Sequence, residues 1–163
     1  MTPIDWATRP LKKYAGFSGR ASRSEFWWYA LLVIVAAVVG MILDSALSLA
    51  PIVLLYGPLT LAVLVATFIP TIAAQLRRLH DTNRSGWWLL AFYILYCGYL
   101  YLTLGNMEAI AAGDMSSLAS VGMVAIVMLI YSIVLIVFYV MKGTTGDNRY
   151  GPDPLAGEAV AAI

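Results

Sequence analysis

Charged residues are scarce in this chain. Asp, Glu, Lys and Arg make up only 12% of its 163 residues, whereas 61% are hydrophobic and the mean hydropathy is +0.82. Soluble domains are about half apolar and carry about 25% charged residues. A chain of this length could not bury such an excess of apolar side chains in its own core. The composition therefore excludes an ordinary soluble domain and indicates a protein that lipid covers over much of its surface.

Reactive side chains are also scarce. Cys97 is the only cysteine, which excludes an intrachain disulfide and a thiolate metal cluster. His80 is the only histidine, so a zinc site would need carboxylates for its remaining ligands. The sequence has neither a Gly-x-Ser-x-Gly nucleophile motif nor a glycine-rich phosphate loop. We therefore expect no catalytic residue, no metal and no cofactor, and the sequence predicts a protein that is not an enzyme.

Lysine and arginine are missing from two of the polar connections, residues 44–51 and 105–118. The ten basic residues all fall in the other three polar segments; they are Arg9, Lys12, Lys13, Arg20, Arg23, Arg77, Arg78, Arg84, Lys142 and Arg149. Cationic segments remain on the cytoplasmic side when a membrane protein is inserted. The pattern predicts an all-α fold, a four-helix integral membrane bundle of two transmembrane hairpins, with both termini in the cytoplasm.

Four apolar stretches are long enough to form these helices, because about 20 residues cross the hydrocarbon layer of about 30 Å. We expect a transmembrane domain at residues 26–141, with spans at about 26–49, 52–76, 87–104 and 119–141. Residues 1–25 would then form a cytoplasmic N-terminal arm, and residues 142–163 a cytoplasmic tail.

Local signals refine the two ends of the first hairpin. Ser22 and Glu25 fit a capping box, in which each side chain accepts from the other residue's backbone N–H, so the first helix should begin near Ser22. The second span is expected to contain Pro58 in its interior. The arm before Ser22 is predicted either to be loosely ordered or to dip its aromatic residues, Trp6 among them, into the membrane interface.

Each of the three cationic segments also carries a distinct sequence motif. They read GRASRSEFW at residues 19–27, RRLHD and SGWW at 77–81 and 85–88, and NRYGPDP at 148–154. In this order they resemble the motifs of DUF805, a family of small bacterial inner-membrane proteins of unknown function. The resemblance covers nearly the whole chain. It implies a four-span protein of the bacterial inner membrane, and it implies no activity, substrate or catalytic residue.

The same segments hold the candidate functional residues. Guanidinium groups suit phosphate geometry, and serine hydroxyls beside helix N-termini add donors for an anion. We predict that an anion or lipid headgroup binds to a set made up of Arg20, Ser22, Arg23, Arg77, Arg78 and Arg84. The alternative is a structural polar network, because a buried charge needs a partner. Its expected members are Glu25, His80, Asp81, Asp147, Asn148 and Arg149.

The expected partners follow from this arrangement. Membrane lipids are predicted to bind at the cytoplasmic face. A second copy of the chain or another membrane protein is a further possible partner, and no nucleic acid is expected. The alternative function is a small oligomeric transporter or channel. Transporters usually place ionisable residues in mid-membrane, whereas here the nearest one, Asp44, lies toward one end of a span. The sequence therefore favours binding over transport.

The charge pattern makes a direct prediction about orientation. Reporters that function only in the cytosol should be active when fused to either terminus, because both ends adjoin cationic segments. Reporters that function only in the periplasm should stay inactive at both positions. A terminus at which the cytosolic reporter is inactive and the periplasmic reporter works would contradict this topology.

Overall fold

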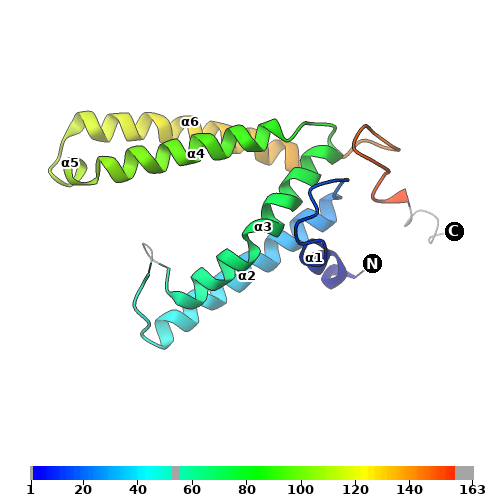
Figure 1. Cartoon of the computed structure of the whole chain (residues 1–163), viewed down its shortest axis with the longest axis horizontal. Coiled ribbons are helices and arrows are strands. Elements are labelled where there is room, and N and C mark those ends of the chain that lie inside the picture. The colour runs from blue at the N-terminus through cyan, green and yellow to red at the C-terminus, as the bar shows by residue number, and fades with distance from the viewer. Residues whose placement is uncertain (1, 53–55, 157–163) are drawn as a thin grey trace. The chain divides into compact units, whose positions relative to one another are not determined.

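The computed structural model describes residues 2–52 and 56–156. Over these ranges the regular structure is almost entirely helical, and an isolated bridge joins Asn148 to Gly151. The helices are α1 (Pro3–Lys12), α2 (Arg23–Ala46), α3 (Pro58–Asp81), α4 (Trp87–Gly105), α5 (Met107–Ala111) and α6 (Met115–Val140) (Figure 1). Four of them, α2, α3, α4 and α6, are long and apolar enough to cross a membrane. The predicted all-α, four-span fold is confirmed.

The chain divides into two compact units. The first comprises Met1–Asn83 with Lys142–Ile163, and the second comprises Arg84–Met141. In the first unit α2 packs against α3, and α1 packs against both. In the second unit α4 packs against α6, and the short α5 joins them. Each unit is thus built on one hairpin of membrane-length helices.

The helix ends differ in places from those expected. Helix α6 begins at Met115, four residues before the predicted start, because Asp114 caps it by accepting from the backbone N–H groups of Ser116 and Ser117. The hydroxyls of Ser117 and Ser116 also donate to this carboxylate, and these bonds lower the pKa of Asp114 to about 2. The cap therefore stays ionised at any physiological pH.

The second span was expected to begin at residue 52 and to contain Pro58 in its interior, and both expectations are wrong. Helix α3 begins at Pro58, which occupies its first position. Proline suits this position because its fixed φ matches the helix and its missing N–H would have no partner there. Residues 53–55 of the expected span lie outside the described ranges.

The N-terminal arm is helical over Pro3–Lys12, so the loosely ordered alternative is wrong. Thr2 caps α1, because its hydroxyl accepts from the backbone N–H of Asp5 while the Asp5 carboxylate accepts from the backbone N–H of Thr2. Trp6 is buried, with 6% of its surface exposed. It therefore faces the other helices of the unit instead of dipping into the interface.

Asp44 closes the far end of the α2–α3 hairpin. Its carboxylate accepts from the backbone N–H groups of Leu59 and Thr60, at 3.0 and 2.9 Å, and from the Thr60 hydroxyl at 2.7 Å. The N-cap of α3 is Gly57, which has no side chain to cap the helix, so Asp44 supplies the cap from the neighbouring helix. A Cβ at Gly57 would overlap the Asp44 carboxylate, which explains the glycine. The acidic side chain nearest mid-membrane thus has a structural role.

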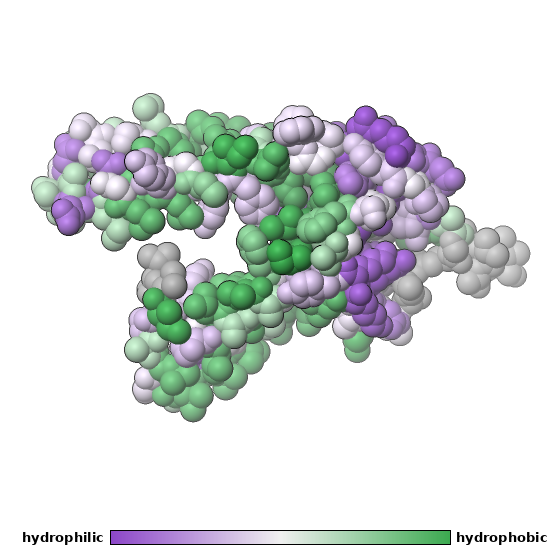
Figure 2. All heavy atoms as spheres, in the orientation of Figure 1, coloured by the Kyte–Doolittle hydropathy of each residue, from purple (hydrophilic) through white to green (hydrophobic). Residues whose placement is uncertain are grey.

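Large apolar side chains remain exposed along the four long helices. Examples are Ile34, Val65, Ile94 and Ile126, with 59–65% of their surfaces exposed. Figure 2 shows hydrophobic residues covering these helices, while hydrophilic residues gather over the segment after α6 and around the α5 turn. Such surfaces are typical of helices that lipid surrounds.

Candidate functional site

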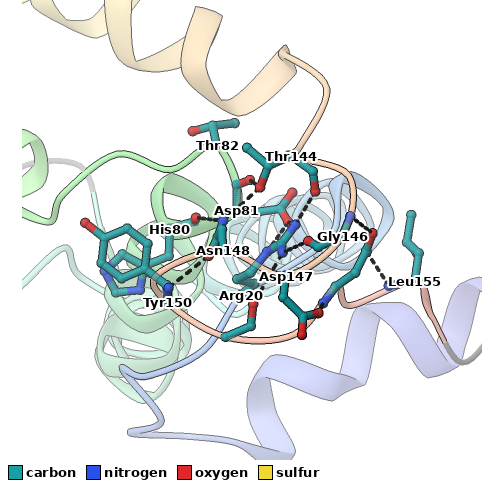
Figure 3. Close-up of polar contacts among 12 residues, drawn as sticks. Arg20, His80, Asp81, Thr82, Thr144, Gly146, Asp147, Asn148, Tyr150 and Leu155 are labelled. Carbon is teal, nitrogen blue, oxygen red and sulfur yellow. Dashed lines mark hydrogen bonds and ion pairs between the residues drawn. The ribbon is translucent and has the colours of Figure 1, made fainter.

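The polar residues of the first unit gather at the end where α2 begins and α3 ends. Three segments that are far apart in the chain meet there: residues 13–25, 77–83 and 142–155 (Figure 3). We call this region the polar end. It contains most of the residues predicted as candidates, so their individual contacts decide what it can do.

Arg20 links all three segments. Its Nε lies 3.0 Å from Oδ1 of Asp81, at the end of α3, and one of its terminal nitrogens lies at the same distance. Its terminal nitrogens also donate to the carbonyl oxygens of Thr144, Gly146 and Gly151 (Figure 3). Only 5% of Arg20 is exposed. The planar guanidinium thus fastens the C-terminal segment onto α3, a task that its fixed fork of donors suits.

Asp81 is the acceptor at the centre of this arrangement. Besides Arg20, the guanidinium of Arg78 donates to its other carboxylate oxygen, and Arg78 is fully buried. The carbonyl oxygen of Asp81 accepts from the backbone N–H and the hydroxyl of Thr144, at 2.9 and 3.1 Å. A Cβ at Gly143 would overlap the Asp81 carboxylate. The segment after α6 therefore approaches α3 as closely as glycine allows.

A further ion pair lies between α2 and α3. Arg77 donates to Oε1 of Glu25 at 3.2 Å, and the Glu25 side chain is fully buried. The other Glu25 oxygen faces Nε of Arg9, in α1, at 3.5 Å. Arg77 also donates to the carbonyl of Gly16. This network ties the N-terminal arm to both long helices.

The expected capping box at the start of α2 is therefore only half formed. The Ser22 hydroxyl accepts from the backbone N–H of Glu25 at 3.2 Å, as predicted. The Glu25 carboxylate is directed to Arg77 and Arg9 instead of to the N–H of Ser22. Two guanidinium partners stabilise a buried carboxylate more than one backbone N–H does, because both partners are charged.

His80 has a structural environment. Its Nδ1 lies 3.1 Å from the carbonyl oxygen of Gly19, and its ring stacks on Tyr150 with 3.9 Å between centroids (Figure 3). Asp81, its neighbour in sequence, is engaged by arginines. No group of three metal-ligating side chains occurs in residues 2–52 and 56–156. The contacts of His80 thus give it a packing role.

The C-terminal segment folds into a compact turn. Asn148 donates to the carbonyl of His80 at 3.0 Å and to the Thr144 hydroxyl at 2.8 Å, and Arg149 donates to the carbonyl of Asn83 at 3.0 Å. Oδ1 of Asp147 accepts from the backbone N–H of Asp153. The turn is therefore held to the end of α3 mainly by hydrogen bonds to backbone carbonyls. Such bonds cannot be recognised from the sequence, because every residue has a backbone carbonyl.

An open pocket lies at the polar end, beside the first turn of α2. Its lining residues are Ser22, Arg23, Ser24, Asp81, Lys142, Gly143, Thr144, Thr145, Asp153, Pro154 and Leu155. The carboxylate of Asp153 has a lowered pKa, because the backbone N–H groups of Leu155 and Gly146 donate to it. Arg23 and Lys142 are exposed and form no ion pair within the ranges that the structure describes. We call this the cationic pocket.

The residues predicted to bind an anion are thus divided. Ser22 and Arg23 line the cationic pocket, whereas Arg20, Arg77 and Arg78 are buried against carboxylates and carbonyls. Lys142 and Thr144 were not among the candidates predicted from the sequence, although both line the pocket. Lys142 could have been found by symmetry, because it follows the last apolar stretch as Arg23 precedes the first.

Arg84 belongs to the second unit. Its guanidinium lies over the ring of Phe138, 3.9 Å from the centroid, and it also contacts the sulfur of Met141. Within that unit Trp88 packs edge-on against Phe138, and the Tyr131 hydroxyl donates to the carbonyl of Trp88. Arg84 thus packs on aromatic side chains at the open end of the α4–α6 hairpin.

Comparison with known protein families gives a match over most of the chain. A family model described as "Protein of unknown function (DUF805)" matches residues 14–152, a range that includes the polar end except for Lys13 and the residues after Pro152. The chain belongs to this family. Helix α1 precedes the matched range.

Named relatives are similar over nearly their whole length. The inner membrane protein YhaI of Escherichia coli (strain K12) is 36% identical over 154 residues, which cover 94% of this chain and 98% of YhaI. The inner membrane protein YhaH of the same strain is 35% identical, over 93% of this chain and 97% of YhaH. No solved structure matches the chain. The relatives and the four membrane-length helices together identify a multi-pass inner-membrane protein whose biochemical function is unknown.

Proposed function

We propose that this protein binds an anionic, phosphate-bearing headgroup in the cationic pocket, on the cytoplasmic side of the inner membrane, and that it does so without catalysing a reaction. One observation carries the proposal: Arg23 and Lys142 line an open pocket without an ion pair in the described ranges, while Arg20, Arg77 and Arg78 beside them are paired and buried. Unpaired cations in a recess attract an anion.

The chemistry of the lining supports this ligand class. Arg23, Lys142, Arg20 and Arg78 provide four positive charges around the pocket, against the two carboxylates of Asp81 and Asp153. Ser24 and Thr145 lie on the same lining, and their hydroxyls can donate to an anion. The lining also includes Arg23 and Ser24, the first two residues of α2, and the N-terminal end of a helix favours negative charge. Guanidinium, ammonium, hydroxyl and N–H donors together are the groups that bind phosphate.

The level of the pocket relative to the membrane surface supports a lipid headgroup in particular. Trp27 and Trp28, one turn into α2, expose 42% and 41% of their surfaces. Tryptophan favours the membrane–water interface, and one turn places Arg23 about 6 Å above these rings. The excess of cations at this end predicts the cytoplasmic side. Basic pockets at this level bind anionic headgroups in other membrane proteins.

The test compares charge removal inside and outside the pocket. Arg23→Gln with Lys142→Gln should lower the phosphatidylglycerol retained by the detergent-extracted protein about 30-fold, since each cation contributes about 1 kcal/mol. Native mass spectrometry counts the retained lipids. Lys12→Gln removes an exposed cation outside the pocket lining and should change retention little.

The proposal fails if the double variant keeps its melting temperature and retains as much phosphatidylglycerol as Lys12→Gln does. Equal retention of phosphatidylcholine and phosphatidylglycerol by the unmodified protein would contradict it as well, because the pocket selects for negative charge.

A further inference from the structure

Helix α1 presents three different faces. Trp6 and Pro10 are buried against the rest of the unit, and Asp5 and Lys12 mark a polar stripe about 100° away. On the third face Ile4 exposes 74% of its surface and Leu11 exposes 37%. A helix with one protein-facing, one polar and one exposed apolar side fits the boundary between headgroups and acyl chains.

An apolar groove runs between this third face and α2. Its walls include Ile4 and Ala7 of α1 and Trp28, Leu31, Leu32 and Val35 of α2. All of these side chains are apolar except for the indole N–H of Trp28. The α2 wall belongs to a membrane-length helix. The groove is therefore a recess in a surface that faces the hydrocarbon layer.

The groove and the cationic pocket are in register along α2. Ser24 lines the pocket, and Trp28, Leu31 and Val35 follow it at intervals of four, seven and eleven residues, on one face of the helix. At 1.5 Å per residue, the groove extends from about 6 Å to about 17 Å beyond Ser24. A phospholipid has the same order: a phosphate, then the glycerol, then the chains.

We propose that the groove between α1 and α2 holds an acyl chain of the phospholipid whose phosphate occupies the cationic pocket. This inference rests on the proposed function and specifies its ligand as a membrane phospholipid, as opposed to a soluble phosphate. A second copy of the chain suits the groove less well, because stable protein interfaces use about 20–30 residues from each partner. The groove is an open recess lined by a few apolar side chains, a surface that one hydrocarbon chain can cover.

The experiment places a bulky side chain in the groove. Ala7→Phe places a ring where the acyl chain would lie, and Ala46→Phe, at an exposed position near the end of α2, is the matched control. The probes are dioleoyl phosphatidylglycerol and glycerol 3-phosphate, each measured by native mass spectrometry. Ala7→Phe should lower retention of the dioleoyl lipid about tenfold or more, because buried methylenes contribute most of that affinity. It should leave binding of glycerol 3-phosphate unchanged.

A second, milder variant keeps the test valid if Ala7→Phe does not fold. Val35→Ala shortens a half-exposed wall of the groove and should lower dioleoyl lipid retention a few-fold without changing the melting temperature. The inference is wrong if both groove variants retain the dioleoyl lipid as Ala46→Phe does. In that case the Arg23 and Lys142 double variant would still report on the headgroup site alone. If that double variant still bound both dioleoyl phosphatidylglycerol and glycerol 3-phosphate as the unmodified protein does, the proposed function itself would be rejected.

Discussion

Replacing Glu25 by glutamine is expected to lower the free energy of unfolding by about 3–5 kcal/mol, because it leaves a buried arginine without its counter-charge. The Glu25 side chain is fully buried and Arg77, its partner at 3.2 Å, is 1% exposed. Glutamine keeps the shape of the side chain and removes only the charge. Denaturant unfolding of the detergent-extracted protein, followed by tryptophan fluorescence, measures the change.

Two further variants separate charge from packing at this pair. Arg9→Gln should cost less than about 1 kcal/mol, because Arg9 is partly exposed and lies 3.5 Å from the carboxylate. Glu25→Gln combined with Arg77→Met removes both buried charges and should restore much of the lost stability. If the combined variant is less stable than Glu25→Gln alone, charge compensation is not the reason for the pair.

Replacing Arg20 by methionine is expected to release the C-terminal segment from α3 and to lower the free energy of unfolding by about 3–5 kcal/mol. The change removes the bonds to Asp81 and to the carbonyls of Thr144, Gly146 and Gly151. Limited proteolysis should then cut within residues 142–156 many times faster than in the unmodified protein. The ion pair between Arg78 and Asp81 remains, so α3 itself should stay folded.

Arg20→Lys provides a sharper comparison. It retains the positive charge but has no planar fork to reach the Asp81 carboxylate and the carbonyls of the C-terminal segment together. We expect most of the protease sensitivity to appear in this variant too. Arg149→Gln is the control, since among the described residues Arg149 donates to the Asn83 carbonyl alone and lies over Tyr150. Equal cleavage of the Arg20 and Arg149 variants would show that Arg20 does not hold the segment.

Hydropathy along the chain predicts the four long helices because each apolar stretch is a local property. The start of α2 follows from Ser22, since an N-cap hydroxyl binds a backbone N–H only three residues away. The start of α3 does not, because its capping group is Asp44, on another helix. Helix α1 was uncertain for a related reason: its stability depends on Trp6 and Pro10 packing against α2 and α3.

The sequence could predict which kinds of residue make up the candidate site, but not which of them form ion pairs with one another. The sequence predicts that the arginines and most of the carboxylates lie on one side of the membrane, and that buried charges need partners. It cannot tell that Arg20 and Arg78 share Asp81 while Arg23 remains open, because the contacts of Arg20 extend to Gly146, 126 residues away. Nor does any local pattern join Lys142 to the N-terminus of α2.

By itself, then, the order of residues determined that this chain forms four apolar helices and gathers its cations in three segments, since composition and periodicity act over a few turns. Only the tertiary structure decided which of those cations are neutralised inside the protein and which line an open pocket. The reason is that burial and ion pairing depend on side chains that folding brings together from distant positions. The cationic pocket and the groove beside it exist only once α1, α2, α3 and the C-terminal segment have packed.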